Sequence, residues 1–484
     1  MRAPRKKPAR KIAPVIAIRL NGRFSLQMQA DGSIAAALGD YSVSLGPFSA
    51  AAMDRAGHLA AGLPLASFAG KSAVAREVDV LVHRLARHGL VEYRLYSPRD
   101  EQDLVVIEPQ VPEYWPQCAK LGNADIVVLS RFAYLRRRGN EMVLESPRAG
   151  ALFRIGDPAI AATLAALSRP QKISKLRREA AFFNLDLLGL LLDSQILLKL
   201  DAKSGDGLRL NEGDGNLVLW DFHDLLFHTR TTEGRHANPV GGTFAYAGAV
   251  APLPAVRPPW PGKTIDLRKF STSEPISPFA KLLRERHSIR DFDDEHPITL
   301  AELAQFLDAT ARVLSEWKSD ANSGVPEVTY STRPYPSAGS AYELELYLAV
   351  SNCEGLDRGL YHYDAGGHAL VAIGASAQQL HALSTAAEFA MDASGPPQVL
   401  ITIAARFGRI SWKYSSIAYS LILKDVGTLI QTFYLAATDM GLGGCAIGTI
   451  NIDLFAKMTE LEFHVESPVG QFALGRGRKP LAAS

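Results

Sequence analysis

The chain has 484 residues, of which 47% are hydrophobic and 21% charged, and its formal net charge is +2 at pH 7. This length predicts two or three domains of a soluble globular protein, and the small net charge argues against a surface that coats nucleic acid. No apolar run approaches the ~18 residues that span a bilayer. The cysteines, Cys118, Cys353 and Cys445, are too widely spaced for a disulfide framework or a zinc site. We therefore expect a cytoplasmic protein without a bound metal.

The first 13 residues form a basic segment that contains Arg2, Arg5, Lys6, Lys7, Arg10 and Lys11. It lacks the apolar core and the small-residue cleavage site of a signal peptide. We expect a disordered tail over residues 1–13, which either stays in solvent or contacts an acidic partner or a membrane surface.

Residues 14–125 and 126–248 predict two copies of one small α/β plan. In the first copy we expect strands at 15–20, 24–29 and 90–96, and helices at 48–59 and 72–88. In the second, a hairpin of 132–138 and 141–145 turns at Gly139-Asn140, a strong turn pair. Helices at 158–167, 173–179 and 185–192 then precede a strand at 196–200. Short helices that close on a hairpin are typical of a winged helix, so we expect two small winged-helix-like units.

A winged helix can bind DNA, bind a peptide by adding it as a strand to the wing, or serve as a spacer. The DNA alternative rests on a basic group, Lys172, Lys175, Arg177 and Arg178, with no aromatic residues interleaved. Further along, His223, Asp224 and His228 have the composition of a metal cluster, but their spacing fits no common site. A structural segment is the simpler interpretation of those three residues.

Residues 249–280 are rich in proline and predict a stiff, extended linker. From 281 to 484 helices and strands alternate. Thr299-Leu300-Ala301-Glu302 is a capping box that opens a helix to about residue 314. Residues 416–440 predict a long helix, apolar around so much of its circumference that it should be buried in a core or a subunit interface. Strands are expected at 344–350, 361–363, 369–373 and 398–404.

Arg286, Ser288 and Arg290 stand at alternate positions just after a short amphipathic run. In an extended segment alternate residues line one face, so these three would converge on one ligand while Ile289 points away. Two guanidiniums and a hydroxyl suit a phosphate and a polar ring edge, because arginine pairs with such oxygens bidentately. The alternative is a solvated basic stretch balanced by the acids that follow it.

Four further segments are weak signals on their own. Residues 336–340 form a loop of small residues that a ligand could approach closely. Residues 441–446 match the letters of the dinucleotide fingerprint, but they follow a helix rather than a strand, so we reject a Rossmann site. Residues 475–479 place three cations after an apolar strand. Lys413 and Tyr414 could act as a base only if their site favoured a deprotonated form, and neighbouring residues generally face different ways, which favours two separate roles.

Together these five segments resemble one family. Residues 281–478 are similar to the FMN-dependent nitroreductase-like fold, and specifically to its SagB/ThcOx-type branch of peptide azoline dehydrogenases. The resemblance implies an α+β fold and the oxidation of thiazoline or oxazoline rings in a ribosomally made precursor peptide to thiazoles or oxazoles. The N-terminal half resembles, more loosely, the winged-helix domains that clamp the leader peptide in this branch. Residues 224–228 resemble a motif that often precedes the branch's linker.

The resemblance also implies roles for individual residues. It assigns FMN binding to Arg286, His287, Ser288, Arg290, Pro336, Ser337, Ala338, Ser340, Ile447, Gly448, Thr449, Arg476 and Arg478. Residues 336–340 would be lent by a partner subunit, which implies a homodimer with FMN at its interface. Lys413 and Tyr414 match the pair that marks the azoline dehydrogenases and would be catalytic. We favour Tyr414 as the proton acceptor and Lys413 as the group that favours its ionised form or polarises the ring nitrogen, with the reverse assignment left open.

The chain departs from the branch at three positions. Ile417 and Ser420 stand where the branch commonly carries arginines, and Thr428 stands where it carries a histidine, so the substrate-side contacts differ. The hypothesis is azoline oxidation within a cyclodehydratase complex. One alternative is an NAD(P)H-dependent nitro- or quinone reductase, which would not need the N-terminal half. The other is a non-catalytic flavin-binding scaffold of an azole-forming complex.

Overall fold

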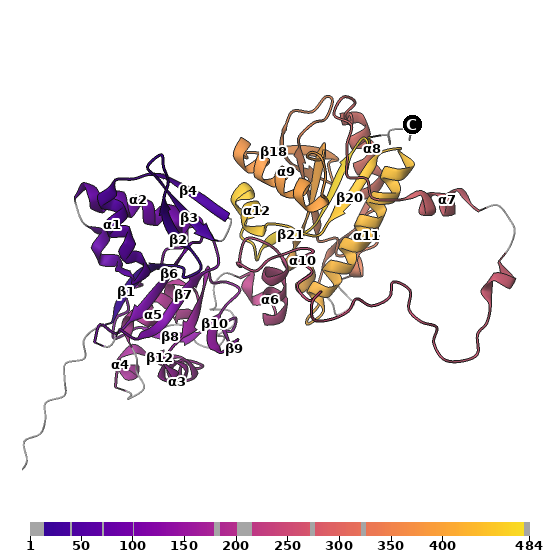
Figure 1. The fold of residues 1–484 in the computed structure, drawn as a ribbon. Coiled ribbons are helices and arrows are strands. Elements are labelled where there is room, and N and C mark those ends of the chain that lie inside the picture. Colours follow the sequence, from indigo (N-terminus) through magenta and orange to yellow (C-terminus); the bar gives the residue numbers. More distant parts are fainter. Residues whose placement is uncertain are drawn as a thin grey trace, which may run out of the picture. The chain divides into compact units, whose positions relative to one another are not determined.

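The structure is a computed structural model that describes residues 14–38, 41–69, 72–99, 101–178, 184–200, 215–271, 276–320 and 326–478. The predicted basic tail, residues 1–13, lies outside these ranges. The chain divides into two compact units, whose elements are labelled in Figure 1. Unit 1 comprises Met1–Arg230 with Gly234–Ala237, and unit 2 comprises Thr231–Glu233 with Asn238–Ser484.

Unit 1 repeats one strand arrangement. Its first part contains β1 (Val15–Leu20), β2 (Ser25–Met28), β3 (Ser33–Leu38), β4 (Tyr41–Pro47), α1 (Ala50–Gly57), β5 (Leu63–Pro64), α2 (Ala73–Arg87), β6 (Val91–Tyr96) and β7 (Asp103–Pro109). Its second part contains β8 (Ile126–Leu129), β9 (Tyr134–Arg138), β10 (Glu141–Glu145), β11 (Ala151–Ile155), α3 (Pro158–Ala166), β12 (Gln171–Lys172), α4 (Ile173–Leu176), α5 (Leu185–Asp193), β13 (Leu197–Leu200) and α6 (Phe222–Thr231). β1 lies between β5 and β6 just as β8 lies between β12 and β13. The strand order therefore agrees with two copies of one plan.

The two parts of unit 1 nevertheless share one sheet and one hydrophobic core. The seven-stranded sheet has the order β5-β1-β6-β7-β11-β10-β9, so β7 of the first part pairs with β11 of the second. Buried residues from Ile18 in β1 to Leu197 in β13 form a single cluster. The hairpin predicted around Gly139-Asn140 is present as β9 and β10, and β9 is an edge of the sheet.

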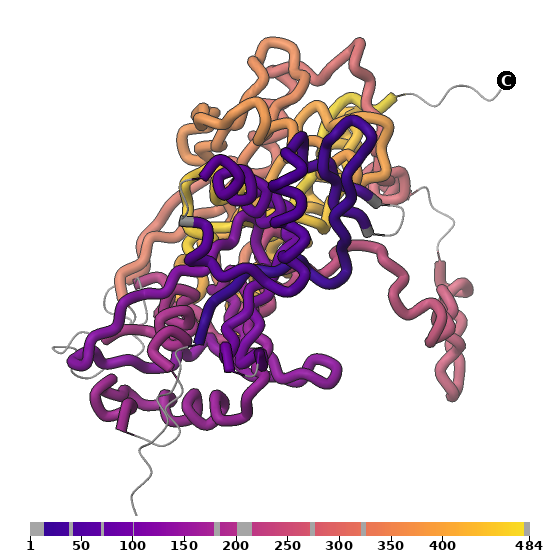
Figure 2. Tube along the Cα trace, turned by 60° about the vertical axis from the view of Figure 1, so that its left-hand side comes forward, coloured from indigo at the N-terminus to yellow at the C-terminus, as the bar shows by residue number. Residues whose placement is uncertain are grey.

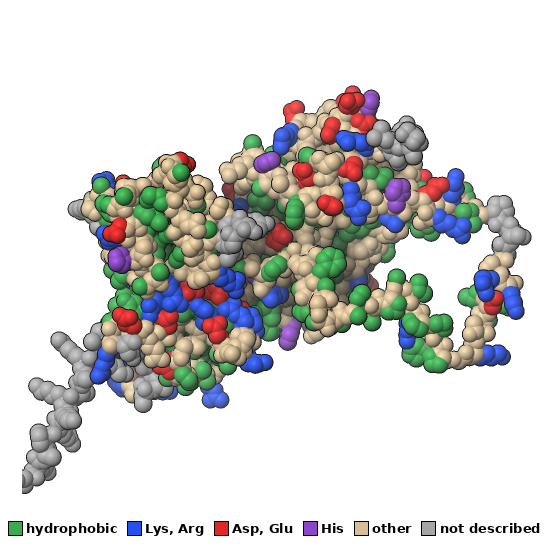
Figure 3. All heavy atoms as spheres, in the orientation of Figure 1, with side chains coloured by type: hydrophobic (Ala, Val, Ile, Leu, Met, Phe, Trp, Pro, Cys, Tyr) green, Lys and Arg blue, Asp and Glu red, His purple; other side chains and the backbone are tan. Residues whose placement is uncertain are grey.

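Ion pairs cross this sheet from strand to strand. Glu92 in β6 pairs with Arg19 in β1 at 2.5 Å and with Arg154 in β11 at 2.7 Å, and Arg154 also pairs with Glu141 in β10 at 3.2 Å. Figure 3 shows acidic and basic side chains gathered over this sheet. Opposite charges on neighbouring strands stabilise the pairing of β1 with β6 and of β10 with β11. The Glu92–Arg154 pair reaches across β7 and joins strands of the two parts.

Unit 2 is a sheet with helices on both faces. Its elements are α7 (Pro278–Glu285), α8 (Leu300–Ala311), β14 (Ser315–Lys318), β15 (Thr329–Thr332), β16 (Leu344–Val350), β17 (Gly359–Asp364), β18 (Ala369–Ile373), α9 (Ala377–Met391), β19 (Val399–Arg406), α10 (Phe407–Ser411), α11 (Ala418–Asp439), β20 (Gly443–Ile447), α12 (Ile452–Thr459) and β21 (Glu466–Gly475). The main sheet has the order β18-β17-β16-β19-β21-β20, with all neighbours antiparallel.

Helices α8 and α11 cover one face of this sheet, where the rings of Phe306, Phe433 and Phe472 pack with centroids 5.2 and 5.4 Å apart. Helices α9 and α12 cover the other face, where Leu383 and Met458 join a second core cluster. Figure 1 shows the sheet between these two pairs of helices. An antiparallel sheet with helices packed on it is an α+β arrangement, as predicted.

Local sequence signals place several elements of unit 2 correctly. The capping box of α8 is present, because the Thr299 hydroxyl accepts the Glu302 N–H at 3.2 Å and the Glu302 carboxylate accepts the Thr299 N–H at 2.9 Å. The predicted long helix is α11, and the strand predicted at 344–350 is β16. Residues 441–446, rejected as a dinucleotide fingerprint, lie at the end of α11 and in β20.

The proline-rich stretch of residues 249–271 is exposed along its length, with Leu253 at 91% and Trp260 at 73% of full exposure. Figure 2 traces it as a long connection with little regular secondary structure. This agrees with an extended linker, since prolines remove the N–H donors that a helix or sheet would use. No helix among the described residues is both long enough and apolar enough to cross a membrane.

Candidate functional site

The segment that follows α7 is extended and lies beside the ends of β20 and β21. Ile289 donates its N–H to the Gly444 carbonyl at 2.9 Å, and Phe292 forms a β-bridge with Gly477. A Cβ atom on Gly443 or Gly477 would meet the Ile289 side chain at 2.8 or 3.1 Å, so both positions need glycine for this close approach. The sheet edge therefore fixes the segment that carries Arg286, Ser288 and Arg290.

Tyr434 in α11 contacts both the segment that follows α7 and the strand β20. Its hydroxyl lies 2.8 Å from the Ser288 hydroxyl and accepts the Ala446 N–H at 2.8 Å. The Arg286 guanidinium carbon lies 4.8 Å from the centre of its ring, within cation–π range. Arg286 and Ser288 thus face the same way and Ile289 faces Gly443, as the alternate spacing predicts. We call Arg286, Ser288, Arg290, Tyr434 and Ala446 the Tyr434 cluster.

Arg290 belongs to this cluster through Cys445. Burial raises the pKa of the Cys445 thiol, and the adjacent Arg290, Ser288 and Tyr434 act in the opposite direction. Ala446 is followed by buried Ile447, exposed Gly448 and half-buried Thr449. The predicted flavin-binding residues 447–449 therefore adjoin the Tyr434 cluster at the end of β20.

The basic residues around the Tyr434 cluster differ in what they contact. Within the described ranges, Arg286, Arg290 and Arg478 form no ion pair with an acidic side chain. Arg476 instead pairs with Glu302 at 2.7 Å. Partial burial raises the pKa of Glu302, but hydrogen bonds from the Thr299 N–H and Arg476 outweigh it and hold that pKa below its ordinary value.

His287 is exposed, and its Nδ1 lies 2.9 Å from the carbonyl oxygen of Glu285 in its own chain segment. His287 and Arg476, both predicted to bind FMN, therefore contact other groups of this chain: His287 the Glu285 carbonyl and Arg476 the Glu302 carboxylate.

Lys413 and Tyr414 meet at Gly339. The Lys413 ammonium donates to the Gly339 carbonyl at 3.1 Å. A Cβ atom on Gly339 would lie 2.6 Å from the Lys413 ammonium and closer still to the Tyr414 hydroxyl, and Gly339 has φ +57°. The expectation that the two neighbours face different ways is wrong for this chain. The reason is local: the N–H groups of Lys413 and Tyr414 both bond to the Ile410 carbonyl, so the pair sits in a tight turn and not in a strand.

Two acids lie beneath the loop that contains Gly339. The Ser337 hydroxyl and the Ala338 N–H both donate to one carboxylate oxygen of Asp425, at 2.9 and 2.8 Å. Ser337 also lies 3.3 Å from the carboxyl of Glu343, a side chain with 0% exposure. Burial, with the Asp425 carboxylate beside it, raises the pKa of Glu343 to about 7. We call Ser337, Gly339, Glu343, Lys413, Tyr414 and Asp425 the Gly339 cluster.

The remaining residues predicted in this loop lie above the acids. Pro336 is exposed and Ala338 is half-buried. Ser340 has φ +54° and donates its N–H to the Ser337 carbonyl at 3.1 Å, which closes a tight turn.

The two clusters lie at different heights on α11. Asp425 and Tyr434 are nine positions apart (434 minus 425), which corresponds to about 14 Å along the helix at 1.5 Å per residue. Within one chain, residues 336–340 therefore contact one level of the helix and residues 286–290 contact another. The sequence analysis did not predict a polar role for Tyr434, because its position fits the apolar stripe of a long helix.

The three departures from the branch lie on or beside α11. Ile417 is 50% exposed and Ser420 is exposed, and both lie at the N-terminal end of α11. The Thr428 hydroxyl donates to the Lys424 carbonyl at 3.0 Å, within the helix itself. These positions therefore present no charge where arginines and a histidine were expected from the resemblance.

The histidines and the aspartate of α6 do not converge. His228 is fully buried and its ring lies 5.9 Å from the ring of Trp220, whereas the His223 side chain is 86% exposed. In the part of the chain that the structure describes, no three His, Cys, Asp or Glu side chains come together as a metal site.

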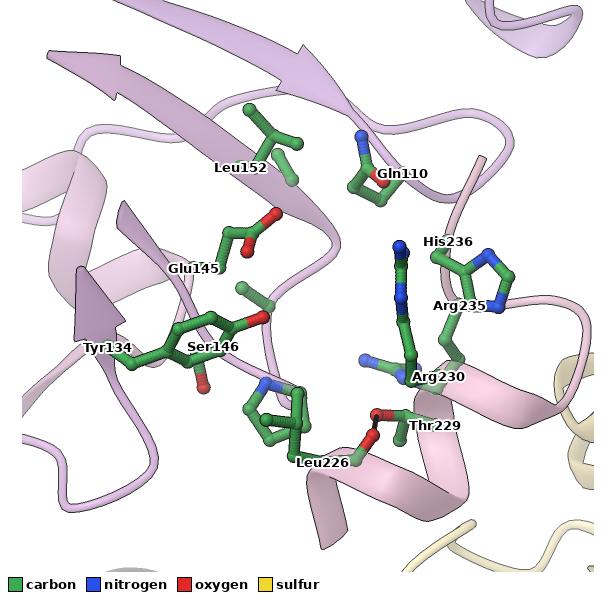
Figure 4. A pocket seen from close by; sticks show the side chains of 13 residues that line it. Gln110, Tyr134, Glu145, Ser146, Leu152, Leu226, Thr229, Arg230, Arg235 and His236 are labelled. Carbon is green, nitrogen blue, oxygen red and sulfur yellow. Dashed lines mark hydrogen bonds between the residues drawn. The ribbon is translucent and has the colours of Figure 1, made fainter. Parts of the chain in front are cut away.

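A cavity of about 50 Å³ lies in unit 1 between β9, β10 and β11 and the segment that contains α6. Figure 4 shows Tyr134 and Glu145 on one side of it and Arg230 and Arg235 on the other. Glu145 accepts hydrogen bonds of 2.7 and 2.9 Å from Arg136, so its negative charge is balanced within the sheet. The two arginines that face Glu145 make the cavity suitable for a small polar or anionic group such as a carboxylate.

Family models match the chain on both sides of the linker. The cyanobactin oxidase ThcOx model matches residues 127–237, and the nitroreductase family model matches residues 283–476. A nitroreductase homologue of Methanocaldococcus jannaschii is 32% identical over 167 residues, which are 34% of this chain and 76% of that protein. The trifolitoxin-processing protein TfxB of Rhizobium leguminosarum bv. trifolii is 26% identical over 144 residues, 29% of this chain and only 39% of TfxB.

Solved structures with similar parts include the E. coli microcin synthetase McbBCD complex with truncated pro-MccB17 bound. That match has 20% identity and a TM-score of 0.37, and it covers 52% of this chain and 91% of the other. A nitroreductase of Desulfovibrio desulfuricans in complex with FMN matches with 15% identity and a TM-score of 0.27, over 43% of this chain and 92% of the other. The family models and the sequence relatives confirm the resemblance seen in the sequence: the chain belongs to the nitroreductase family and is of the SagB/ThcOx type.

Proposed function

We propose that this chain is an FMN-dependent oxidoreductase that oxidises thiazoline or oxazoline rings in a precursor peptide to thiazoles or oxazoles. The observation that carries the proposal is the convergence of Lys413 and Tyr414 on Gly339. Azoline oxidation must remove a proton from a ring carbon, and this pair offers a positioned acceptor. The matches to a cyanobactin oxidase and to a trifolitoxin-processing protein support a peptide substrate.

The Tyr434 cluster fits FMN by the chemistry of its donors. Arg286 and Arg290 of the cluster offer guanidiniums that form no ion pair with an acidic side chain in the described ranges, and Ser288 offers a hydroxyl. Arg478, whose N–H donates to the Asp291 carbonyl next to Arg290, adds a third guanidinium, and the Asp291 carboxylate is the acid nearest to Arg290 and Arg478. Such groups suit a phosphate and the polar edge of a ring system. We assign phosphate contacts to Arg286, Ser288 and Arg478, and the polar ring edge to Arg290. When bound, FMN supplies the two-electron acceptor of the reaction.

The reaction takes one proton and one hydride from adjacent ring carbons, and aromatisation supplies the driving force. We assign the proton to the Tyr414 hydroxyl oxygen. Lys413, which donates to the Gly339 carbonyl at 3.1 Å, lies beside Tyr414 and would polarise the nitrogen of the azoline ring. The reverse assignment, with Lys413 as acceptor, uses the same two atoms. In both cases the contribution of the protein is to orient the ring and hold the acceptor in place.

The separation of the two clusters along α11 supports a homodimer. In one chain, residues 336–340 contact Asp425, about 14 Å along the helix from Tyr434. We propose that a second subunit supplies these residues to the flavin site, as the resemblance implies. Each site would then combine the Tyr434 cluster of one chain with the 336–340 loop of the other.

We propose that unit 1 clamps the leader part of the precursor peptide through its winged-helix-like repeats, and that the chain works with a cyclodehydratase. β9 is an edge strand, and a peptide can extend a sheet at such an edge. The cavity that Tyr134 and Arg230 line adjoins this strand and could receive an acidic side chain of the peptide. The ThcOx match covers both features.

The proposal is tested by mass spectrometry of an azoline-containing peptide incubated with the FMN-loaded protein. We expect a loss of two hydrogens per ring, abolished by Lys413→Ala with Tyr414→Phe in a protein that stays yellow. Lys424→Ala, which removes another exposed lysine of the same region, is the matched control and should oxidise the peptide normally. Unchanged azole formation by the double variant would refute the assignment.

The same assay separates the two alternatives. An NAD(P)H-dependent nitro- or quinone reductase would consume NAD(P)H with small acceptors and leave the peptide mass unchanged. A flavin-binding scaffold would do neither, and the uncharged Ile417 and Ser420 are the positions that favour this alternative.

A further inference from the structure

Glu343 and Asp425 form a pair of buried acids with too few donors for two negative charges. Glu343 has 0% exposure and Asp425 has 7%. The Ser337 hydroxyl lies 2.9 Å from Asp425 and 3.3 Å from Glu343, and it also accepts the Tyr342 N–H at 2.9 Å. A hydroxyl has one proton, so Ser337 can donate to only one of the two carboxyl groups at a time.

The shorter contact assigns the Ser337 proton to Asp425, which also accepts the Ala338 N–H. An ionised Glu343 would then face a second carboxylate with only its own backbone N–H as a donor. Its other oxygen, Oε1, has no hydrogen-bond partner among the described residues. One proton on Glu343 removes the repulsion and supplies the missing donor, and this agrees with the pKa of Glu343, which burial and Asp425 raise to about 7.

Glu345, two residues further along, shows what Glu343 lacks. Burial raises the pKa of Glu345, but His362, Arg333 and Arg406 outweigh it and hold that pKa below its ordinary value. No Lys, Arg or His in the described ranges lies within ion-pair distance of Glu343. The other titratable groups around Glu343 are Asp425 from α11, Glu345 from β16, and Tyr335, Tyr342 and Arg333 from the segment between β15 and β16.

The acids hold a loop whose backbone is otherwise unfavourable. Gly339, Ser340 and Tyr342 all have positive φ, at +57°, +54° and +45°. Residues other than glycine rarely adopt this backbone conformation, so surrounding contacts must maintain it. Asp425 fixes the residues immediately before Gly339, and the Gly339 carbonyl in turn holds Lys413.

We infer that Glu343 and Asp425 share one proton and, through the loop of residues 337–342, position Lys413 and Tyr414. Both acids are positioning residues, because they act through Ser337, Ala338 and Gly339. When Glu343 loses its proton, the two carboxylates repel each other, the loop loosens, and Lys413 loses its anchor. The effect on azoline oxidation rests on the proposed function, whereas the shared proton does not.

The sign of the pH effect follows from the direction of the shift. The folded state holds the Glu343 proton more tightly than the unfolded chain does, so folding is favoured at low pH. This contribution is lost as the pH rises from the ordinary Glu value of 4.5 through about 7. The loop is therefore most firmly held in mildly acidic to neutral solution and is released above it.

The test uses the full chain without added flavin and compares the wild type with Glu343→Gln. Glutamine is uncharged at every pH and keeps an N–H donor for Ser337 or Asp425. We expect the unfolding equilibrium constant of the wild type, relative to E343Q, to rise by about 10- to 100-fold between pH 4.5 and pH 7. An infrared band of a protonated carboxyl should disappear near pH 7 in the wild type and be absent from E343Q.

Two further variants keep the inference falsifiable. Asp425→Asn removes the second charge and should move the disappearance of the band to lower pH, and it serves if E343Q does not fold. Glu345→Gln removes a carboxylate that already has cationic partners and should leave the band in place. Parallel pH profiles for wild type and E343Q, with no titrating carboxyl band, would overturn the shared proton.

Activity separates positioning from the proposed reaction. Azoline oxidation by E343Q should persist above pH 7, where that of the wild type declines. A titrating band with identical pH–activity profiles for both proteins would overturn the positioning role. A titrating band in a protein that oxidises no azoline at any pH would contradict the proposed function and leave the shared proton standing.

Discussion

Helix α11 supports two clusters of opposite electrostatic character. At the level of Tyr434, the Arg286 guanidinium lies over the tyrosine ring, and the hydroxyl of Tyr434 contacts Ser288 and Ala446. Among the nearby arginines of the described ranges, Arg476 pairs with Glu302, whereas Arg286 and Arg290 form no ion pair with an acidic side chain. At the level of Asp425, a lysine and a tyrosine meet above two buried acids. The first arrangement is suited to holding an anion, and the second to holding and moving protons. One helix thus positions both parts of the proposed oxidation while keeping them apart within a chain.

The largest effect on azoline oxidation is expected at Gly339, where the Gly339 cluster is most crowded. Gly339→Ala would place a Cβ atom 2.6 Å from the Lys413 ammonium and strain a backbone at φ +57°. We expect the displaced pair to lower azoline oxidation by about 10²- to 10⁴-fold, the usual contribution of a positioned acid–base group. Flavin should still bind, because the groups to which we assign its phosphate and its polar ring edge, Arg286, Ser288, Arg290 and Arg478, are unchanged.

Gly427→Ala is the matched control for Gly339→Ala. Gly427 also lies in unit 2, in α11, and a Cβ atom there would meet nothing within 4 Å. This variant should oxidise azolines at the wild-type rate. Near-normal oxidation by Gly339→Ala itself would mean that the Lys413–Tyr414 pair needs no fixed position.

A smaller effect, on FMN affinity, is expected in the Tyr434 cluster. Arg286→Ala removes a guanidinium that lies over the Tyr434 ring and has no acidic partner in the described part of the chain. A hydrogen bond to a charged group contributes about 1.5–3 kcal/mol, so the dissociation constant for FMN should rise about 10- to 100-fold. Flavin fluorescence quenching measures this directly.

Arg284→Ala removes an exposed arginine from the last turn of α7, two residues before Arg286, and should bind FMN as the wild type does. Equal FMN affinity of the Arg284 and Arg286 variants would show that the Tyr434 cluster is a solvated basic surface and not a flavin site.

The sequence predicts those features of unit 2 that depend on nearest neighbours. The capping box of α8, the strand β16 and the facing of Arg286 and Ser288 follow from spacing alone, because helices and strands have fixed periods. β20 was not predicted, since its glycines and small residues lack the β-branched pattern of a strand.

The rest of the candidate site depends on contacts that no local pattern contains. Glu343 and Asp425 are 82 positions apart (425 minus 343) and meet only because the segment before β16 lies against α11, where Ser337 contacts both acids. Tyr434 fits an apolar stripe, and its polar role appears only when Ser288 and Ala446 reach its hydroxyl. The meeting of Lys413 and Tyr414 depends on a turn at the end of α10 that their sequence does not announce.

The smallest effects are expected for Arg476 and Arg478, which the sequence analysis predicts as a pair but which make different contacts in the structure. Arg476 is occupied by Glu302, whereas Arg478 is exposed and pairs with no acidic side chain in the described ranges. Arg478→Ala should therefore weaken FMN binding by up to about tenfold and leave stability nearly unchanged. Arg476→Ala should instead lower the free energy of unfolding by about 1 kcal/mol, because it leaves a partly buried carboxylate without its partner. Denaturant unfolding and FMN titration of both variants measure the two quantities, and the reverse pattern would mean that Arg476 leaves Glu302 to contact the flavin.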